Sequence, residues 1–135
     1  MRETIWVESW QLECCGDPFK VGFEVCWTVC PAAEEDLAHR LGPELARAVT
    51  GLEEHHGGEN TRPVTGTVRS IRAVCLEYAP RFGEDPRMLY PVRGTTVVTE
   101  VQTANRSFTG GDLSFAGYVV DLLLEVRRVT GDMRA

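Results

Sequence analysis

Residues 21–29, VGFEVCWTV, alternate apolar and polar side chains without interruption, and this pattern constrains the fold more than any other stretch of the chain. Successive side chains of a β-strand point to opposite faces of the sheet. The alternation therefore predicts a strand with one face toward a hydrophobic core. That face would carry Val21, Phe23, Val25, Trp27 and Val29.

Further segments have the composition of strands. TIWVESW, residues 4–10, has apolar side chains on both faces, which predicts a strand buried on both sides. In VTGTVRSIRAVCLEYAP, residues 64–80, the apolar phase slips by one position, which predicts a β-bulge near Ser70. Two more strands are predicted in TTVVTEVQTA, residues 95–104, and in GYVVDLLLEVRRV, residues 117–129.

A helical period interrupts the strands. CPAAEEDLAHRLG, residues 30–42, has acidic residues near its start and places Leu37 and Leu41 on one stripe. PELARAVTGLEE follows at residues 43–54 as a second helix that begins with proline. The apolar stripe of this helical pair, at about residues 32–54, is too narrow to be buried by itself. We therefore expect the pair to pack over one end or one side of the strands.

Five or six strands with short turns and one helical insertion fit a single small β-barrel domain over residues 1–135. The fold class is mainly β. PFKVGFEVCW followed by GTVRSI resembles the first two strands of an SH3-like barrel, and an OB-like barrel has similar elements. A composition of 43% hydrophobic and 25% charged residues is ordinary for a globular domain.

WVESWQLECCGDPFKVGFEVCW, EEHHGG and GTVRSIRAV together resemble a family of small uncharacterised actinobacterial proteins, known only as a domain of unknown function. The resemblance covers most of the chain and implies no activity, cofactor or site. Thirteen of the fourteen basic residues are arginine, as expected from G+C-rich coding sequences, which are common in actinobacteria.

Several classes of protein are disfavoured. No apolar stretch approaches the ~20 residues of a membrane span, and the N-terminus lacks the apolar region of a signal peptide. We therefore expect a cytoplasmic protein with reduced thiols, and the odd number of five cysteines argues against a disulfide framework. The net charge of −6 opposes wholesale binding of nucleic acid.

Two pairs of residues suggest a metal site. Cys14 and Cys15 end the first strand segment, and His55 and His56 follow the second helix. Two cysteines and two histidines form the ligand set of structural zinc sites, although adjacent residues of an extended chain point apart. One residue of each pair, with a carboxylate such as Glu54, would bind zinc if the two turns meet, and we predict that they do. The alternative is buried cysteines with the histidines in solvent.

Six arginines and three acidic residues lie in residues 62–93. Arg62, Arg69 and Arg72 would form a nucleic-acid or anion-binding face if they share one surface. The alternative is a solvated, ion-paired surface.

Fingerprints of catalysis are missing, because the sequence contains no dinucleotide-binding, phosphate-loop, zinc-protease or nucleophile-elbow motif. An enzymatic role therefore has little support. The sequence favours a cytoplasmic interaction module with a protein or peptide partner and no cofactor. The alternatives are a small metal-binding protein or metal-dependent enzyme, and an arginine-rich nucleic-acid binder.

Overall fold

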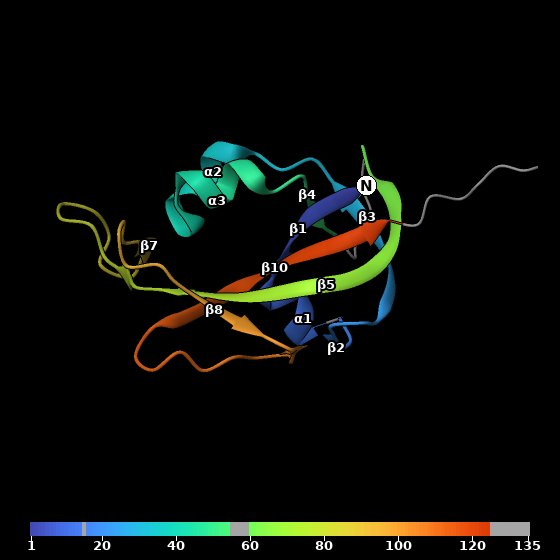
Figure 1. The fold of residues 1–135 in the computed structure, drawn as a ribbon. Coiled ribbons are helices and arrows are strands. Elements are labelled where there is room, and N and C mark those ends of the chain that lie inside the picture. Colours follow the sequence, from blue (N-terminus) through green and yellow to red (C-terminus); the bar gives the residue numbers. More distant parts are fainter. Residues whose placement is uncertain (15, 55–59, 125–135) are drawn as a thin grey trace, which may run out of the picture.

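The computed structural model describes residues 1–14, 16–54 and 60–124. The chain forms a closed five-stranded β-barrel with one additional strand (Figure 1). Around the barrel the strands are β10 (Ser114–Leu124), β1 (Arg2–Glu8), β4 (Gly51–Glu53), β3 (Glu24–Cys30) and β5 (Arg62–Leu76), and β5 pairs with β10 to close the ring. β8 (Val97–Val101) pairs with β5 outside the ring. The predicted fold class, a mainly β barrel with a helical insertion, is confirmed.

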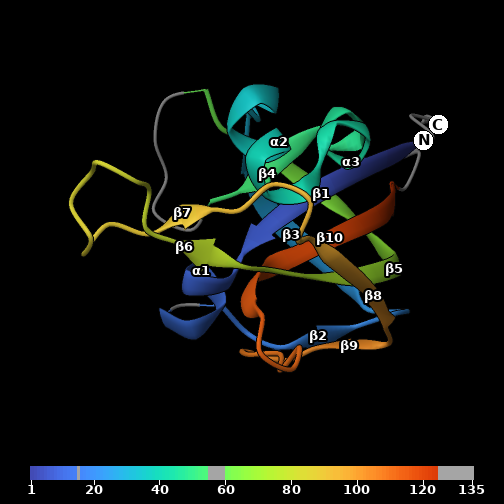
Figure 2. The same ribbon diagram turned by 90° about the vertical axis from the view of Figure 1, so that its left-hand side faces the viewer.

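Three short helices and four two-residue strands of the described chain lie outside the barrel strands (Figure 2). They are α1 (Ser9–Cys14), β2 (Phe19–Lys20), α2 (Glu34–Leu41), α3 (Pro43–Ala48), β6 (Tyr78–Ala79), β7 (Tyr90–Pro91) and β9 (Thr103–Ala104). β2 pairs with β9, and β6 pairs with β7 to form the base of a long loop. No helix among the described residues is long and apolar enough to cross a membrane.

β5 is the central strand, because it pairs with β3, β8 and β10. Along β10, Asp121 lies opposite Ser70 and the next residue lies opposite Val68, so Arg69 is the extra residue of a bulge. The bulge predicted near Ser70 is thus confirmed. It restores the phase of the strand, since Val68 before it and Ile71 after it both face the barrel interior.

The interior of the barrel is filled by apolar side chains from all sides. β10 contributes alternate residues, as its period predicts. One of them, Tyr118, donates a hydrogen bond of 2.9 Å from its hydroxyl to the carbonyl oxygen of Asn105. The other buried members of this core are Ile5, Val7, Leu12, Phe19, Val29, Val64, Val68, Ile71, Ala73, Ala104, Val120 and Leu122.

A second core lies outside the barrel, where the helical pair packs on its side as expected (Figure 1). Trp6 on β1 is completely buried there, although its neighbours Ile5 and Val7 point into the barrel. β1 is therefore buried on both faces, as its sequence predicts. The remaining buried members are Leu37, Leu41, Ala46, Val49, Val74, Leu76, Ala116 and Val119.

The predicted extent of the second helix, to residue 54, is wrong. α3 ends at Ala48, and residues 51–53 form β4, parallel to β1 and antiparallel to β3. Gly51 makes this possible, because a Cβ atom there would lie 2.3 Å from Cγ1 of Val29. Pairing with two strands in the closed barrel outweighs the helical propensity of the segment.

Two assignments near the N-terminus also need correction. Trp10 belongs to α1 and is about half exposed, so the first strand ends earlier than residue 10. Phe23 is exposed, because Gly22 turns the chain with a φ of 97° and β3 begins only at Glu24. The rest of the predicted inward face of β3 packs on the core, with Val29 fully buried and Trp27 partly buried.

Candidate functional site

The predicted zinc ligands Cys15, His55 and His56 lie outside the described residues. The segments next to them do approach each other. Gly16 and Asp17, after the cysteines, and Glu53, before the histidines, line one cavity of about 20 Å³. The contact of the cysteine and histidine pairs themselves stays a prediction.

Cys14 is disulfide-bonded, whereas Cys26, Cys30 and Cys75 carry free thiols. The metal-ligand role predicted for Cys14 stays a prediction. Within residues 1–14, 16–54 and 60–124, no three histidine, cysteine or acidic side chains group as metal ligands.

Glu53 is the principal buried acid of this end of the barrel, with 3% of its surface exposed. Burial, and secondarily the charge of Glu54, raise its pKa to about 7. Burial and the same two carboxylates also raise the pKa of the Cys30 thiol. Cys30 is therefore protonated near neutral pH, which is the opposite of an activated nucleophile.

The three predicted arginines lie on β5, but carboxylates neutralise two of them. Arg62 donates to both carboxylate oxygens of Glu3, at 2.5 and 2.6 Å, and this contact lowers the pKa of Glu3. Arg72 Nη2 lies 3.5 Å from Oδ2 of Asp121. Arg69, at the bulge, is exposed and forms no ion pair with a described carboxylate.

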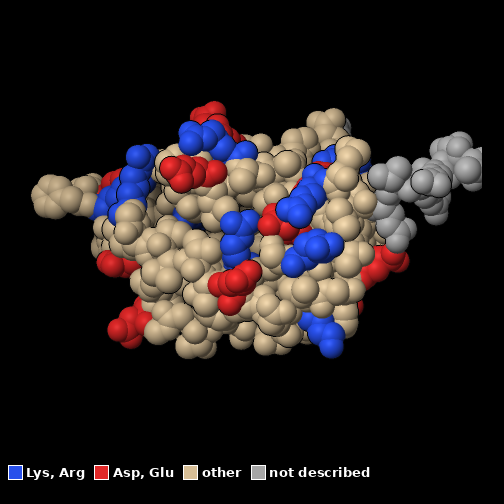
Figure 3. Space-filling model, in the orientation of Figure 1, with Lys and Arg blue, Asp and Glu red and all other residues tan. Residues whose placement is uncertain are grey.

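Basic and acidic side chains accordingly alternate over this side of the molecule (Figure 3). The surface is mixed in sign rather than uniformly positive, so the geometry does not favour a phosphate backbone as its ligand.

A groove between the α2–α3 turn and β8 is larger than the cavity beside Glu53. Two adjoining pockets, of about 580 and 430 Å³, share Leu41, Gly42, Pro43 and Val98 as lining residues. The first also includes Glu44, Leu45, Ala48 and Arg72, and the second also includes Ala38, His39, Arg93, Gly94 and Thr96. We call these residues the helix–strand groove.

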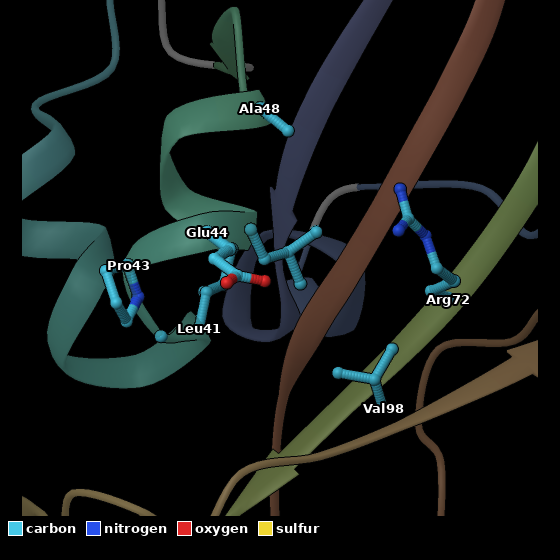
Figure 4. Close-up of a pocket in the computed structure, with 8 residues that line it drawn as sticks. Leu41, Pro43, Glu44, Ala48, Arg72 and Val98 are labelled. Atoms are coloured by element: carbon cyan, nitrogen blue, oxygen red, sulfur yellow. The ribbon is translucent and has the colours of Figure 1, made fainter.

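The two walls of the groove come from different parts of the chain. Figure 4 shows Leu41, Pro43 and Glu44 on the helical side and Arg72 and Val98 on the strand side. Val98 pairs in register with Val74, which is buried under the helices, so both belong to the outer face of the sheet.

Two contacts hold the walls together. The hydroxyl of Thr96 donates a 2.5 Å hydrogen bond to the carbonyl oxygen of Arg40 at the end of α2. Arg93 Nη2 lies 3.3 Å from Nδ1 of His39. The groove is thereby preformed.

β8, whose Val98 lines this groove, is an edge strand of the sheet. β8 pairs with β5 on one side, and no described strand pairs with its other side. Val97 and Val98 are 50% and 43% exposed, and the strand contains no proline or lysine to protect the edge. Sequence reasoning found the strand but not this property. The available signal was a run of adjacent valines with no positive charge or proline.

Comparison with known proteins gives a family and no activity. The chain matches the model of a family of unknown function, DUF6578, over residues 1–124. No curated protein and no solved structure is significantly similar to it. The resemblance to a family of uncharacterised proteins is confirmed, and the chain belongs to the DUF6578 family of unknown function.

Proposed function

We propose that this domain is a protein-interaction module that binds an extended peptide by adding it as a strand to the free edge of β8. The observation that carries the proposal is the unprotected edge itself, next to two half-exposed valines. In this mode, backbone hydrogen bonds supply affinity and alternate side chains supply specificity. Small SH3-like and OB-like barrels use exposed faces for binding, which supports the proposal by fold analogy.

The face of β8 indicates which side chains the peptide would present. Val98 and Glu100 pair with Val74 and Arg72 of the outer face, so peptide side chains beside them would lie on the same outer face of the sheet. The side chains of Val97 and Thr99 point to the opposite face of the strand. An apolar side chain beside Val98 and a basic side chain beside Glu100 are complementary to this edge.

Prolines at two adjacent positions test the mode of binding. Successive residues of a strand direct their N–H groups to opposite edges, so one of Val98 and Thr99 faces β5 and the other faces the free edge. A proline that faces β5 removes a ladder hydrogen bond and lowers Tm, whereas a proline at the free edge keeps the fold. The alanine variant at the same position controls for loss of the side chain.

The probe is a random peptide library displayed on phage and selected on the wild-type protein. Peptides from this selection should bind the stable proline variant at least about tenfold more weakly than the matched alanine variant. A selection that yields no binder, or peptides that bind the stable proline variant as tightly as the alanine variant, would contradict the proposal.

A further inference from the structure

We propose that two copies of this chain associate by inserting the loop of residues 80–89 of each copy into the helix–strand groove of the other. This inference goes beyond the proposed function, because it uses side-chain contacts in the groove and not the backbone edge of β8. It rests on a convex apolar element and a concave apolar element that lie next to each other on one molecule.

The convex element is the loop between β6 and β7. Phe82 is fully exposed, and Met88 and Leu89 are more than half exposed. Three large apolar side chains on one loop are unusual for a surface that contacts only water. The loop forms a projection at the left of Figures 1 and 3.

The loop is braced by its own contacts. The guanidinium of Arg81 lies 4.1 Å from the ring centroid of Tyr90, and the Tyr90 hydroxyl donates to Glu84 at 3.1 Å. Asp85 accepts from the backbone N–H of Arg87 at 2.9 Å and from its guanidinium at 3.1 Å. An ordered loop loses little conformational entropy on binding, so its exposed apolar side chains are suited to insertion.

The concave element is the helix–strand groove. Its apolar lining includes Leu41, Pro43, Leu45, Ala48 and Val98, and its two pockets have the volume for an aromatic side chain and a neighbour. Because Phe82 is fully exposed, it does not fill the groove of its own chain.

The loop begins and ends beside the groove. Arg93 and Gly94, a few residues after the loop, line the second pocket, and the backbone N–H of Val92 is bonded to Glu77 at the base of the loop. When a projection and a recess lie side by side, a two-fold axis between two molecules can place each projection in the recess of the other. Such an exchange closes at a dimer.

Charge also favours a protein groove over a lipid surface. The loop contains Arg81 and Arg87 against Glu84 and Asp85, so it has no net charge. Insertion into anionic membranes is supported by basic excess, which this loop lacks. Arg87 already pairs with Asp85, and Arg81 and Glu84 each contact Tyr90, so all four charged side chains of the loop have a partner before insertion.

Sedimentation velocity of the full chain over a concentration series tests the dimer. The wild-type protein should dimerise, and Phe82→Ser should weaken dimerisation at least about tenfold, the effect of losing an aromatic anchor. Phe23→Ser is the matched control, since Phe23 is also an exposed phenylalanine but lies outside the loop and the groove. It should leave dimerisation unchanged.

The groove is tested with Ala48→Lys, because Ala48 is exposed and lines the first pocket. Ala33→Lys adds the same charge to an exposed alanine that lines neither groove pocket and is the control. Ala48→Lys should weaken dimerisation, whereas Ala33→Lys should not.

Mixing separates this contact from a general surface effect. Phe82→Ser has an intact groove and Ala48→Lys has an intact loop, so one productive insertion remains possible only between the two variants. The mixture should contain heterodimers although each variant alone is monomeric. A monomeric wild type, unaffected dimers of Phe82→Ser, or a mixture without heterodimers would overturn the proposal. A vesicle-binding assay gives one more contrary outcome. If vesicles with one-third anionic lipid bound the wild-type monomer but not Phe82→Ser, the loop would be a membrane contact and the proposal would be overturned.

Discussion

Arg40 on α2 donates two hydrogen bonds to the carboxylate of Glu8 on β1, at 2.8 and 2.7 Å. The guanidinium also lies 5.4 Å from the centre of the buried Trp6 ring. This bidentate pair connects the helical pair to the barrel at the border of the second core, where only about a fifth of each side chain is exposed. It fixes one wall of the helix–strand groove, since the carbonyl oxygen of the same Arg40 binds Thr96.

Arg40→Ala should therefore lower the free energy of unfolding by about 2–3 kcal/mol, because it leaves the half-buried Glu8 without its partner. Arg87→Ala is the matched control, since Arg87 pairs with Asp85 on the exposed loop, where an ion pair contributes little. Urea denaturation of both variants measures the difference. Equal effects would show that the Arg40 contact does not stabilise helix docking.

Gly117→Ala should destabilise the fold by about 3 kcal/mol, the upper range for overpacking. Gly117 has a φ of 155°, and a Cβ atom there would lie 2.2 Å from the carbonyl oxygen of Val7 and 2.9 Å from the Trp6 ring.

Gly111→Ala is the control for backbone strain alone. Gly111 also has a positive φ, of 68°, but no atom lies within 4 Å of its Cβ position. This change should cost only about 1–2 kcal/mol, the preference against the left-handed region. Thermal denaturation of the two variants compares them, and a smaller loss at Gly117 than at Gly111 would contradict the close approach of β10 to β1.

Most of the fold was predictable because long strands carry their own pattern. β5 and β10 alternate over many residues, and even the bulge at Arg69 leaves a phase slip in the sequence. β4 was not predictable, since three residues carry too little periodicity and their strand conformation depends on pairing with β1 and β3.

The helix–strand groove was not predictable for a different reason. Its walls come from residues 38–48 and residues 72–98, which are distant in sequence and meet only through the order of the sheet. The exposure of Val97 and Val98 likewise follows from the edge position of β8 and not from local sequence. The cluster of arginines, in contrast, indicated a basic segment that includes Arg62 and Arg72. It could not indicate that carboxylates on β1 and β10 pair with these two arginines.

Replacing the three tryptophans by alanine should give three different losses of stability. Trp6 is completely buried between the barrel and the helices, so Trp6→Ala should cost about 3–5 kcal/mol. Trp27→Ala should cost less, because Trp27 is partly exposed and contacts Phe19 at a ring distance of 5.1 Å. Trp10→Ala, on the exposed side of α1, should cost under about 1 kcal/mol. Chemical denaturation ranks the three, and a larger loss at Trp10 than at Trp6 would contradict the second core.

Glu53 should make the stability of the domain depend on pH. Its pKa of about 7 in the folded state lies above the ordinary value of 4.5, so folding favours the protonated acid. The stabilisation is complete below the pKa of the unfolded state and is lost as pH rises through 7. Between about pH 4 and about pH 8 the free energy of unfolding should fall by about 3 kcal/mol through this residue.

Glu53→Gln removes the titration and keeps a similar side-chain volume, so its free energy of unfolding should change less with pH than that of the wild type. It should be more stable than the wild type at about pH 8 and should lose this advantage at about pH 4. Glu54→Gln serves as a second probe, since the charge of Glu54 is the smaller cause of the raised pKa of Glu53, and it should reduce the pH dependence only in part. Urea titrations at a series of pH values measure all three proteins. If Glu53→Gln retained the full pH dependence of the wild type, another group would be responsible.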